Sequence, residues 1–199
     1  AWISDHHDIH FKPAPYFRKQ FAVTKKIKCA IAYIAVAGLY EISINGKRVG
    51  DHFLDPMYTR FDRRTLYVTH DVTSDLQKGN NAVGVVLGNG WYNHQSLAVW
   101  DFHNAPWRGR PTFCLDLRIV YEDGSEETIK TDRDWKTSAG PIIANSIYTG
   151  EHYDARLEQV GWDQPDFDDS KWQGVRYRSV PSGNIVAQEI APIRLIKEY

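Results

Sequence analysis

The sequence is short of cysteine, of any excess of charge, and of long apolar runs. Its two cysteines, Cys29 and Cys114, are too few for a metal site built from thiolates alone, and they leave open two free thiols or one disulfide. The 24 basic residues against 25 acidic residues give a net charge of -1. This balance argues against a nucleic-acid partner, because a nucleic-acid surface needs a basic footprint. No apolar run approaches the ~20 residues that span a bilayer, so we expect no membrane partner.

Helical periodicity and several catalytic motifs are also missing. No G-x-S-x-G segment occurs, which removes the usual signature of a serine nucleophile. The glycine-containing segment 84–90 lacks the lysine and the strand-to-helix switch of a phosphate-binding loop. The first seven residues have neither a positively charged region nor a following apolar region, so we expect no signal peptide in this sequence.

An apolar–polar alternation with a period of two runs through most of the chain. It is clearest at Thr112–Tyr121 and at Leu39–Ile44, whereas 28–37 reads as a strand buried on both faces. Asn45-Gly46 and Asp123-Gly124 are tight-turn signals between such segments. Several short strands separated by turn residues predict an all-β fold, a β-sandwich with long loops.

Aromatic residues are abundant, with seven tryptophans and eleven tyrosines. Such rings either pack against the C–H faces of sugars or fill the interface between sheets, and the count alone leaves both readings open. Trp135 and Trp172 each stand alone between polar or turn-rich segments, so we expect them to plug an edge of the sandwich.

Five motifs follow one another in a fixed order. The segment GLYEISINGKRVG at 38–50 is followed by VTHDVT at 68–73, LGNGWY at 87–92, YTGEHYDAR at 148–156 and FDDSKW at 167–172. This order resembles the N-terminal domain of bacterial α-L-rhamnosidases, glycoside hydrolase family 78. Each motif alone is weak, but the resemblance extends over residues 16–196.

The resemblance implies a galactose-binding-like sandwich of jelly-roll type. We expect one domain over residues 1–199, with residues 1–12 frayed and 139–173 forming a long irregular covering segment. The family's catalytic carboxylates lie in a separate α/α-barrel domain, so we expect a fragment of a larger enzyme, with that barrel as partner and no catalytic residue here. The resemblance also allows for calcium, although no metal ligand is assigned, and favours a periplasmic or secreted protein over a cytoplasmic one.

Two irregular stretches carry the candidate sugar-binding residues. Glycines at 88 and 90 permit close approach of the backbone to a ligand, and the next long loop is rich in aromatic residues. Trp91 or Tyr92 would be the stacking platform, unless both only cap the edge of a sheet. The predicted sugar-binding residues are Asn89, Trp91, Tyr92, His94, Trp100, Asp101, Trp107 and Glu151.

The remaining acidic residues have simpler interpretations. Glu151, Asp154 and Arg156 form either an ion-pair network that pins a loop or part of a ligand site. Asp168 and Asp169 stand where a following turn needs a cap. Two functions remain: recognition of a rhamnose-containing glycan, or a structural module that packs on the catalytic barrel. A self-sufficient hydrolase is the least favoured reading.

Overall fold

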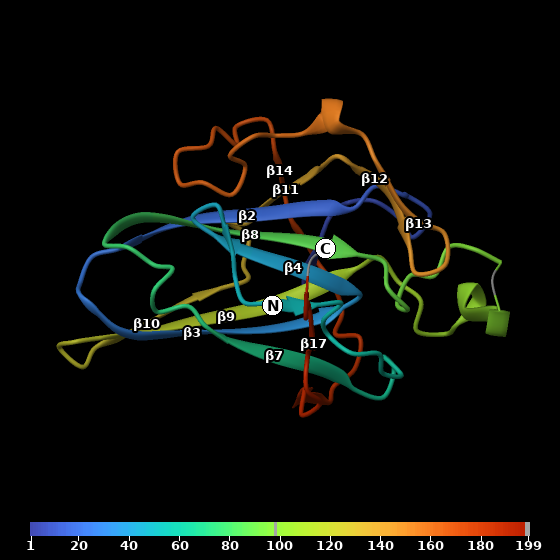
Figure 1. Ribbon diagram of the computed structural model, residues 1–199, viewed down its shortest axis with the longest axis horizontal. Helices are drawn as coiled ribbons and strands as arrows, with labels where there is room; N and C mark the ends of the chain where they lie inside the picture. The colour runs from blue at the N-terminus through green and yellow to red at the C-terminus, as the bar shows by residue number, and fades with distance from the viewer. Residues whose placement is uncertain (98, 198–199) are drawn as a thin grey trace.

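The computed structural model describes residues 1–97 and 99–197, and the fold is a sandwich of two β-sheets packed face to face (Figure 1). One sheet has the order β15-β1-β9-β3-β7-β16, with β10 paired to β9, and the other has the order β14-β11-β2-β8-β4-β5. We call them the lower sheet and the upper sheet, after their places in Figure 1. The prediction of an all-β sandwich is therefore confirmed.

The lower sheet consists of β1 (Ile3–Ser4), β3 (Ile27–Ala37), β7 (Thr65–Asp71), β9 (Thr112–Tyr121), β10 (Glu126–Lys130), β15 (Arg176–Tyr177) and β16 (Ile185–Ala187). The upper sheet consists of β2 (Pro15–Val23), β4 (Leu39–Ile44), β5 (Lys47–Arg48), β8 (Gly79–Gly88), β11 (Lys136–Ala139) and β14 (Gln173–Gly174). Two small sheets pair β12 (Ile142–Ser146) with β13 (Gly150–Tyr153), and β6 (His52–Phe53) with β17 (Ile193–Arg194). Two short 3₁₀ helices are η1 (Val99–Asn104) and η2 (Ala155–Leu157). No helix in the described part of the chain is both long and apolar enough to cross a membrane.

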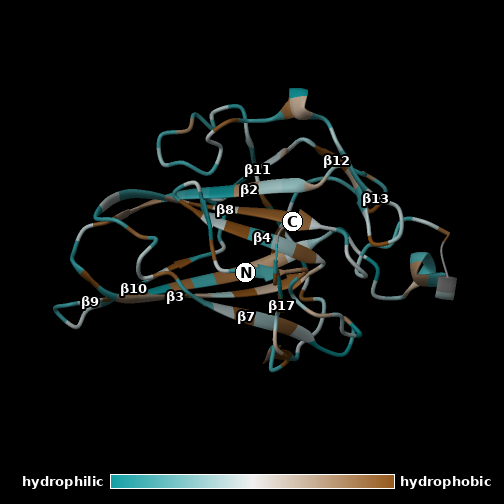
Figure 2. Cartoon of the chain, in the orientation of Figure 1, coloured by the Kyte–Doolittle hydropathy of each residue, from teal (hydrophilic) through white to brown (hydrophobic). Residues whose placement is uncertain are grey.

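The core forms where the apolar sides of the two sheets meet. Phe17 of β2 packs edge-on against Phe113 of β9 at 5.1 Å between ring centroids, and Phe113 packs in turn against Trp135 at 5.3 Å. All three rings are fully buried. The hydropathy colours of Figure 2 show brown, apolar stretches along the strands of both sheets. Alternation thus places one face of each strand in this core and leaves the other face for the covering segments.

The predicted turn between β4 and β5 is present. Asn45 and Gly46 have φ angles of 53° and 78°, the left-handed values that a tight hairpin turn requires at both central positions. Cys29 and Cys114 are both free and half-buried, so the structure decides between the two alternatives in favour of thiols. Burial raises the pKa of Cys114 to about 11.

The first residues are more ordered than the expected frayed segment 1–12. Ile3 of β1 pairs with Phe113 of β9 and with Tyr177 of β15, and the side chain of Ile3 is fully buried. Asp5 forms a buried ion pair with Arg110 at 2.6 Å. The strand pairing and this ion pair hold residues 3–5 in the lower sheet, which local sequence could not reveal.

The segment 139–173 covers the outer face of the upper sheet, and it is less irregular than expected because it contains the hairpin β12–β13 and η2. The Trp162 ring lies over Gly84, where an added Cβ would come within 2.7 Å of it. Arg18 is buried under the same segment and donates to the backbone oxygens of Trp162 and Gln164 at 2.8 and 2.9 Å. These contacts fasten the segment to β2 and β8.

Three acidic residues of this segment act as caps or in ion pairs. Asp168 accepts from the backbone N–H of Ser170 at 3.0 Å, so its predicted capping role is confirmed. Asp169 does not cap with its side chain, because its carboxylate pairs with Arg18 and with Lys136. Asp154 caps η2 and pairs with Arg156 at 2.6 Å.

Candidate functional site

Asn89, the first residue of the predicted site, is buried and already engaged. Its backbone N–H donates to Asn145 Oδ1 at 2.7 Å, and its Nδ2 donates to the backbone oxygen of Asn145 at 3.1 Å. Its Oδ1 accepts from Asn93 Nδ2 at 3.0 Å. Asn89 therefore ties the end of β8 to β12, and its amide is not available to a sugar in this arrangement.

Trp91 lies in an aromatic cluster formed by Tyr58, Trp91, Phe102 and Tyr148. The centroid of the Trp91 ring lies 6.0 Å from that of Tyr58, 5.0 Å from that of Phe102 and 5.7 Å from that of Tyr148. His94 stacks on Trp91 at 5.9 Å and is itself buried, which lowers the pKa of its imidazole. The half-buried Trp91 ring thus contacts four protein rings, and its role as a stacking platform for a sugar stays a prediction.

Tyr92 is a core residue. It is buried beside Phe61, whose ring lies 5.0 Å away, and it belongs to a second apolar cluster with Trp2. Gly109 is required beside it, because an added Cβ would lie 2.6 Å from the Tyr92 hydroxyl oxygen. The burial of Tyr92 therefore favours a ring that closes the edge of the sandwich over a stacking platform for a sugar.

The loop that carries Trp100, Asp101 and Trp107 meets the Trp91 loop, as expected, but through a residue that was not predicted. Phe102 of η1 contacts both Trp91, at 5.0 Å, and Trp107, at 6.0 Å. Trp100 and Asp101 are exposed, whereas Trp107 is half-buried with its Nε1 buried and without a partner among the described residues. The two loops therefore form one aromatic surface, and Trp100 is its most exposed ring.

Glu151 lies elsewhere, on the wall of a groove between the upper sheet and the hairpin β12–β13. This hairpin groove has a volume of about 530 Å³. Across its floor Tyr16 of β2, Val86 of β8 and Glu41 of β4 stand in register on the outer face of the sheet. Since neighbouring strands lie about 4.8 Å apart, the floor from Tyr16 to Glu41 is about 10 Å wide.

The hairpin forms the opposite wall of the groove. Asn145 of β12 pairs with Glu151 of β13, and both residues line the groove together with Tyr153. Gly88 and Leu39 pair at the end of the floor, where Asn145 Oδ1 lies 3.5 Å from the position that a Cβ on Gly88 would occupy. The groove thus combines tyrosine rings, apolar side chains, an amide and two carboxylates, which is the mixture that sugar sites use.

The groove carries a negative field. The pKa of Tyr16 is raised to about 12, first by burial and then by the neighbouring Tyr153 and the carboxylates Glu151, Glu41 and Glu158. Tyr153 donates to Glu158 at 2.8 Å, and this hydrogen bond raises the pKa of Tyr153. Tyr16, Glu41 and Tyr153 were not predicted as site residues. The alternation at Leu39–Ile44 predicts that one face of β4 is exposed. The residues around β4 in the sequence do not predict that the hairpin β12–β13 lies over this face.

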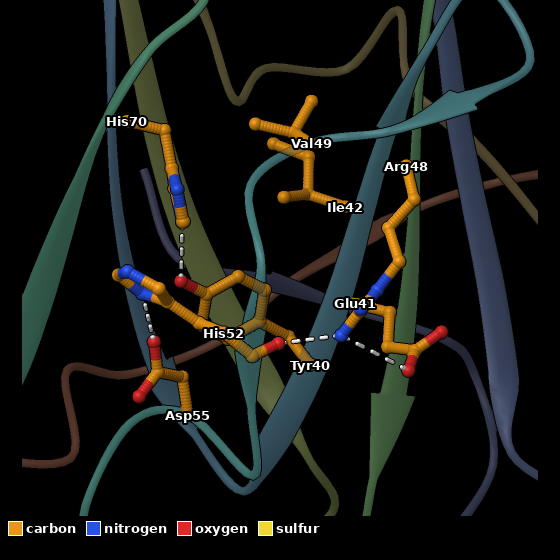
Figure 3. A pocket seen from close by; sticks show the side chains of 8 residues that line it. All are labelled: Tyr40, Glu41, Ile42, Arg48, Val49, His52, Asp55 and His70. Atoms are coloured by element: carbon orange, nitrogen blue, oxygen red, sulfur yellow. Dashed lines mark hydrogen bonds and ion pairs between the residues drawn. The ribbon is translucent and has the colours of Figure 1, made fainter. Parts of the chain in front are cut away.

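A second group of polar side chains lies beneath β4 and beside the groove (Figure 3). Tyr40 and His70 Nε2 form a 2.8 Å hydrogen bond, and His52 Nδ1 lies 2.8 Å from Asp55 Oδ2. Gln188 donates to the other oxygen of Asp55 at 3.0 Å. The space among these side chains is about 10 Å³, enough for one water molecule and too small for a sugar. This polar cluster therefore joins the C-terminal segment to β4 and β7.

No cluster of three or more His, Cys, Asp or Glu side chains is placed to bind a metal in residues 1–97 and 99–197. Asn89 offers an amide oxygen of the kind that calcium binds, but this Oδ1 accepts from Asn93 Nδ2 at 3.0 Å. A calcium site needs six to eight oxygens directed at one point, so the Asn89 side chain in this arrangement does not fit one.

The architecture defines the class of protein first: a β-sandwich with a groove suited to a small polar ligand. The family model of the α-L-rhamnosidase N-terminal domain matches residues 25–197, and the chain belongs to this family. It is 39% identical over 190 residues to an α-L-rhamnosidase of Formosa agariphila. The aligned region covers 94% of this chain and 20% of that protein.

Solved structures agree with this family. The α-L-rhamnosidase structure from Dictyoglumus thermophilum superposes with a TM-score of 0.89 at 39% identity, over 98% of this chain and 23% of that one. The Streptomyces avermitilis α-L-rhamnosidase, solved with L-rhamnose, gives 0.87 at 37% identity, over 94% of this chain and 18% of that one. The chain thus spans about a fifth of the length of the relatives it matches.

Proposed function

We propose that this chain is the non-catalytic glycan-recognition domain of an α-L-rhamnosidase, and that the hairpin groove holds the sugar. The observation that carries the proposal is the groove itself, which brings Tyr16, Glu41 and Glu151 together from three strands around about 530 Å³. Carboxylates accept hydrogen bonds from hydroxyl groups, and tyrosine rings cover the C–H faces of a sugar.

The rest of the activity belongs to the remainder of the parent protein. This chain would be a single domain, residues 1–199, and the hydrolysis of terminal L-rhamnose would take place in the α/α-barrel domain of the same polypeptide. The relatives support this arrangement because they are α-L-rhamnosidases about five times longer than this chain. L-rhamnose is the first ligand to try, since the Streptomyces avermitilis enzyme was solved with it.

The test is a titration of the purified chain with methyl α-L-rhamnoside, followed by calorimetry and by NMR shifts of the groove residues. We expect weak affinity, with a Kd of roughly 10 µM to 1 mM, because a small polar ligand exchanges hydrogen bonds with water almost evenly. Tyr153→Ala should weaken binding about tenfold. Tyr177→Ala is the matched control, since Tyr153 and Tyr177 are 53% and 45% exposed and both lie on short strands, but Tyr177 does not line the groove.

If no sugar shifts the groove resonances at millimolar concentration, the recognition function is wrong. The aromatic cluster supports the second candidate, a structural module that packs on the catalytic barrel. Trp100 beside this cluster is 75% exposed, and Tyr58 and Tyr148 within it are also exposed. Exposed apolar patches of this kind commonly mark contact surfaces. For this candidate, Trp100→Ser would lower the Tm of the full-length enzyme and leave the Tm of this chain unchanged.

A further inference from the structure

The side chains that line the hairpin groove carry charge of one sign only. Glu41 stands on the sheet side and Glu151 on the hairpin side. Among the described residues that line the groove, none is lysine, arginine or histidine. A bound ligand would therefore lie between two carboxylates with no cation facing it.

Arg48, the cation that approaches Glu41, does not line the groove. Its Nη2 lies 3.7 Å from Glu41 Oε1 and donates to the backbone oxygen of His52, as Figure 3 shows. Its guanidinium also lies over the Phe53 ring at 4.2 Å. Arg48 reduces the charge of Glu41 from one side, and its Nη2 is engaged by oxygens of the protein.

Tyr16 lines the groove together with Glu41 and Glu151. Burial is the main reason that the pKa of Tyr16 rises to about 12, and Glu151, Glu41 and Glu158 add to it by repelling the phenolate. A carboxylate or sulfate on a ligand would meet the same repulsion as the phenolate does. An uncharged sugar would not, and its hydroxyl groups would instead donate to the two carboxylates.

We propose that the hairpin groove selects uncharged glycans and rejects acidic ones, with Glu41 and Glu151 as the residues that determine this selectivity. The inference rests on the proposed function, because it names the class of ligand that the same groove accepts. Two like charges about 5–10 Å from a ligand carboxylate, partly screened by water, give a preference on the order of tenfold.

The experiment compares two ligands that differ in one group. The first is a rhamnosyl disaccharide whose second sugar is a uronate, and the second is the same disaccharide with the carboxylate reduced to a primary alcohol. Titrated against the full 199-residue chain in low salt, the neutral form should bind at least tenfold more tightly. The ratio should fall at 0.5 M salt, because a Debye length of about 4 Å screens the repulsion.

Variants assign the selectivity to the two carboxylates. The double variant Glu41→Gln/Glu151→Gln keeps the shape of the groove, and both residues are exposed, so the fold should persist. In this variant the ratio of the two affinities should approach one. Glu126→Gln on β10 is the matched control and should keep the wild-type ratio. Glu126 is also exposed and also approached by an arginine, Arg118, but both residues lie on the lower sheet, away from the groove.

Each outcome decides a separate point. Equal or tighter binding of the uronate form overturns the selectivity and leaves the proposed function standing. A preference that survives in the double variant overturns the role of Glu41 and Glu151. Failure of both disaccharides and of methyl α-L-rhamnoside to bind overturns the proposed function and the selectivity together.

Discussion

Trp172 shows how one buried ring holds the covering segment in place. It is 8% exposed, donates from Nε1 to Gln159 Oε1 at 2.9 Å, and packs against Trp162 and Phe167 at 6.2 and 5.8 Å. The expectation that it plugs an edge of the sandwich agrees with this burial. The ring therefore contributes apolar burial and one hydrogen bond at the same time.

We expect Trp172→Ala to lower the free energy of unfolding by about 3–5 kcal/mol, the range for truncating a large buried aromatic side chain. Urea denaturation followed by circular dichroism measures this change. Trp100→Ala is the matched control, and because Trp100 is largely exposed it should cost about 0.5 kcal/mol or less. Equal midpoints for the wild type and Trp172→Ala would show that the ring does not contribute to stability.

His70 makes the stability of the fold depend on pH. Burial, followed by the neighbouring His52, lowers the pKa of His70 below its ordinary value of 6.5, while Asp55 and Asp51 act in the opposite direction. Because the unfolded chain takes up the proton first, the stability contributed by neutral His70 is complete above about pH 6.5. It is lost progressively as the pH falls from that value towards the lower pKa of His70 in the folded state.

We therefore expect the free energy of unfolding to decrease from pH 7 to pH 5.5 and to decrease less in His70→Gln. Glutamine cannot titrate and still offers an oxygen to the Tyr40 hydroxyl that His70 Nε2 now bonds. Urea titrations at several pH values give the slope. An unchanged slope in His70→Gln would exclude His70 as the group responsible.

At the scale of elements, the hairpin β12–β13 decides whether a groove exists. The hairpin is fastened at one end by the hydrogen bonds between Asn89 and Asn145, and at the other by Ala14 N–H, which donates to the backbone oxygen of Ile142 at 2.9 Å. Among the residues that the structure describes, its strands pair only with each other. Few backbone bonds therefore oppose its movement away from the upper sheet.

Asn145→Ala should cost about 1–3 kcal/mol, because it leaves the buried N–H of Asn89 without an acceptor. It should also raise hydrogen exchange over 142–153 and weaken sugar binding, since the wall of the groove loosens. Hydrogen exchange detected by mass spectrometry measures the first effect and calorimetry the second. Asn104→Ala, at an exposed position on η1, is the control. If hydrogen exchange over 142–153 in Asn145→Ala is as slow as in this control, Asn145 does not hold the hairpin in place.

At the scale of the whole molecule, binding and hydrolysis are separate properties. We expect this chain alone to release no rhamnose from 4-nitrophenyl α-L-rhamnoside, because the family resemblance places the catalytic carboxylates in another domain. Liberation of nitrophenol, followed by its absorbance, is the measurement. Turnover by the pure chain that disappears in Glu151→Gln would contradict this prediction and make the groove a catalytic site.

The sequence by itself determined the properties that depend on neighbouring residues. Alternation at Leu39–Ile44 and Thr112–Tyr121 predicted strands that the structure contains, since the period of side chains in a strand is local. Asn45-Gly46 predicted the turn between β4 and β5 because few residue pairs adopt two successive positive φ angles. The ordered motifs predicted the family, which the match over residues 25–197 confirms.

Only the tertiary structure decided which polar and aromatic residues remain available to a ligand. Asn89 and Tyr92 are residue types that sugar sites use, yet both are buried. Asn89 is hydrogen-bonded to the hairpin β12–β13, and Tyr92 belongs to an apolar cluster formed by residues distant in the sequence. Tyr16, Glu41 and Glu151 are far apart in the chain, and they share a groove because 139–173 folds back over the upper sheet. Burial and proximity of this kind arise from long-range pairing of strands, which local patterns of residue type do not contain.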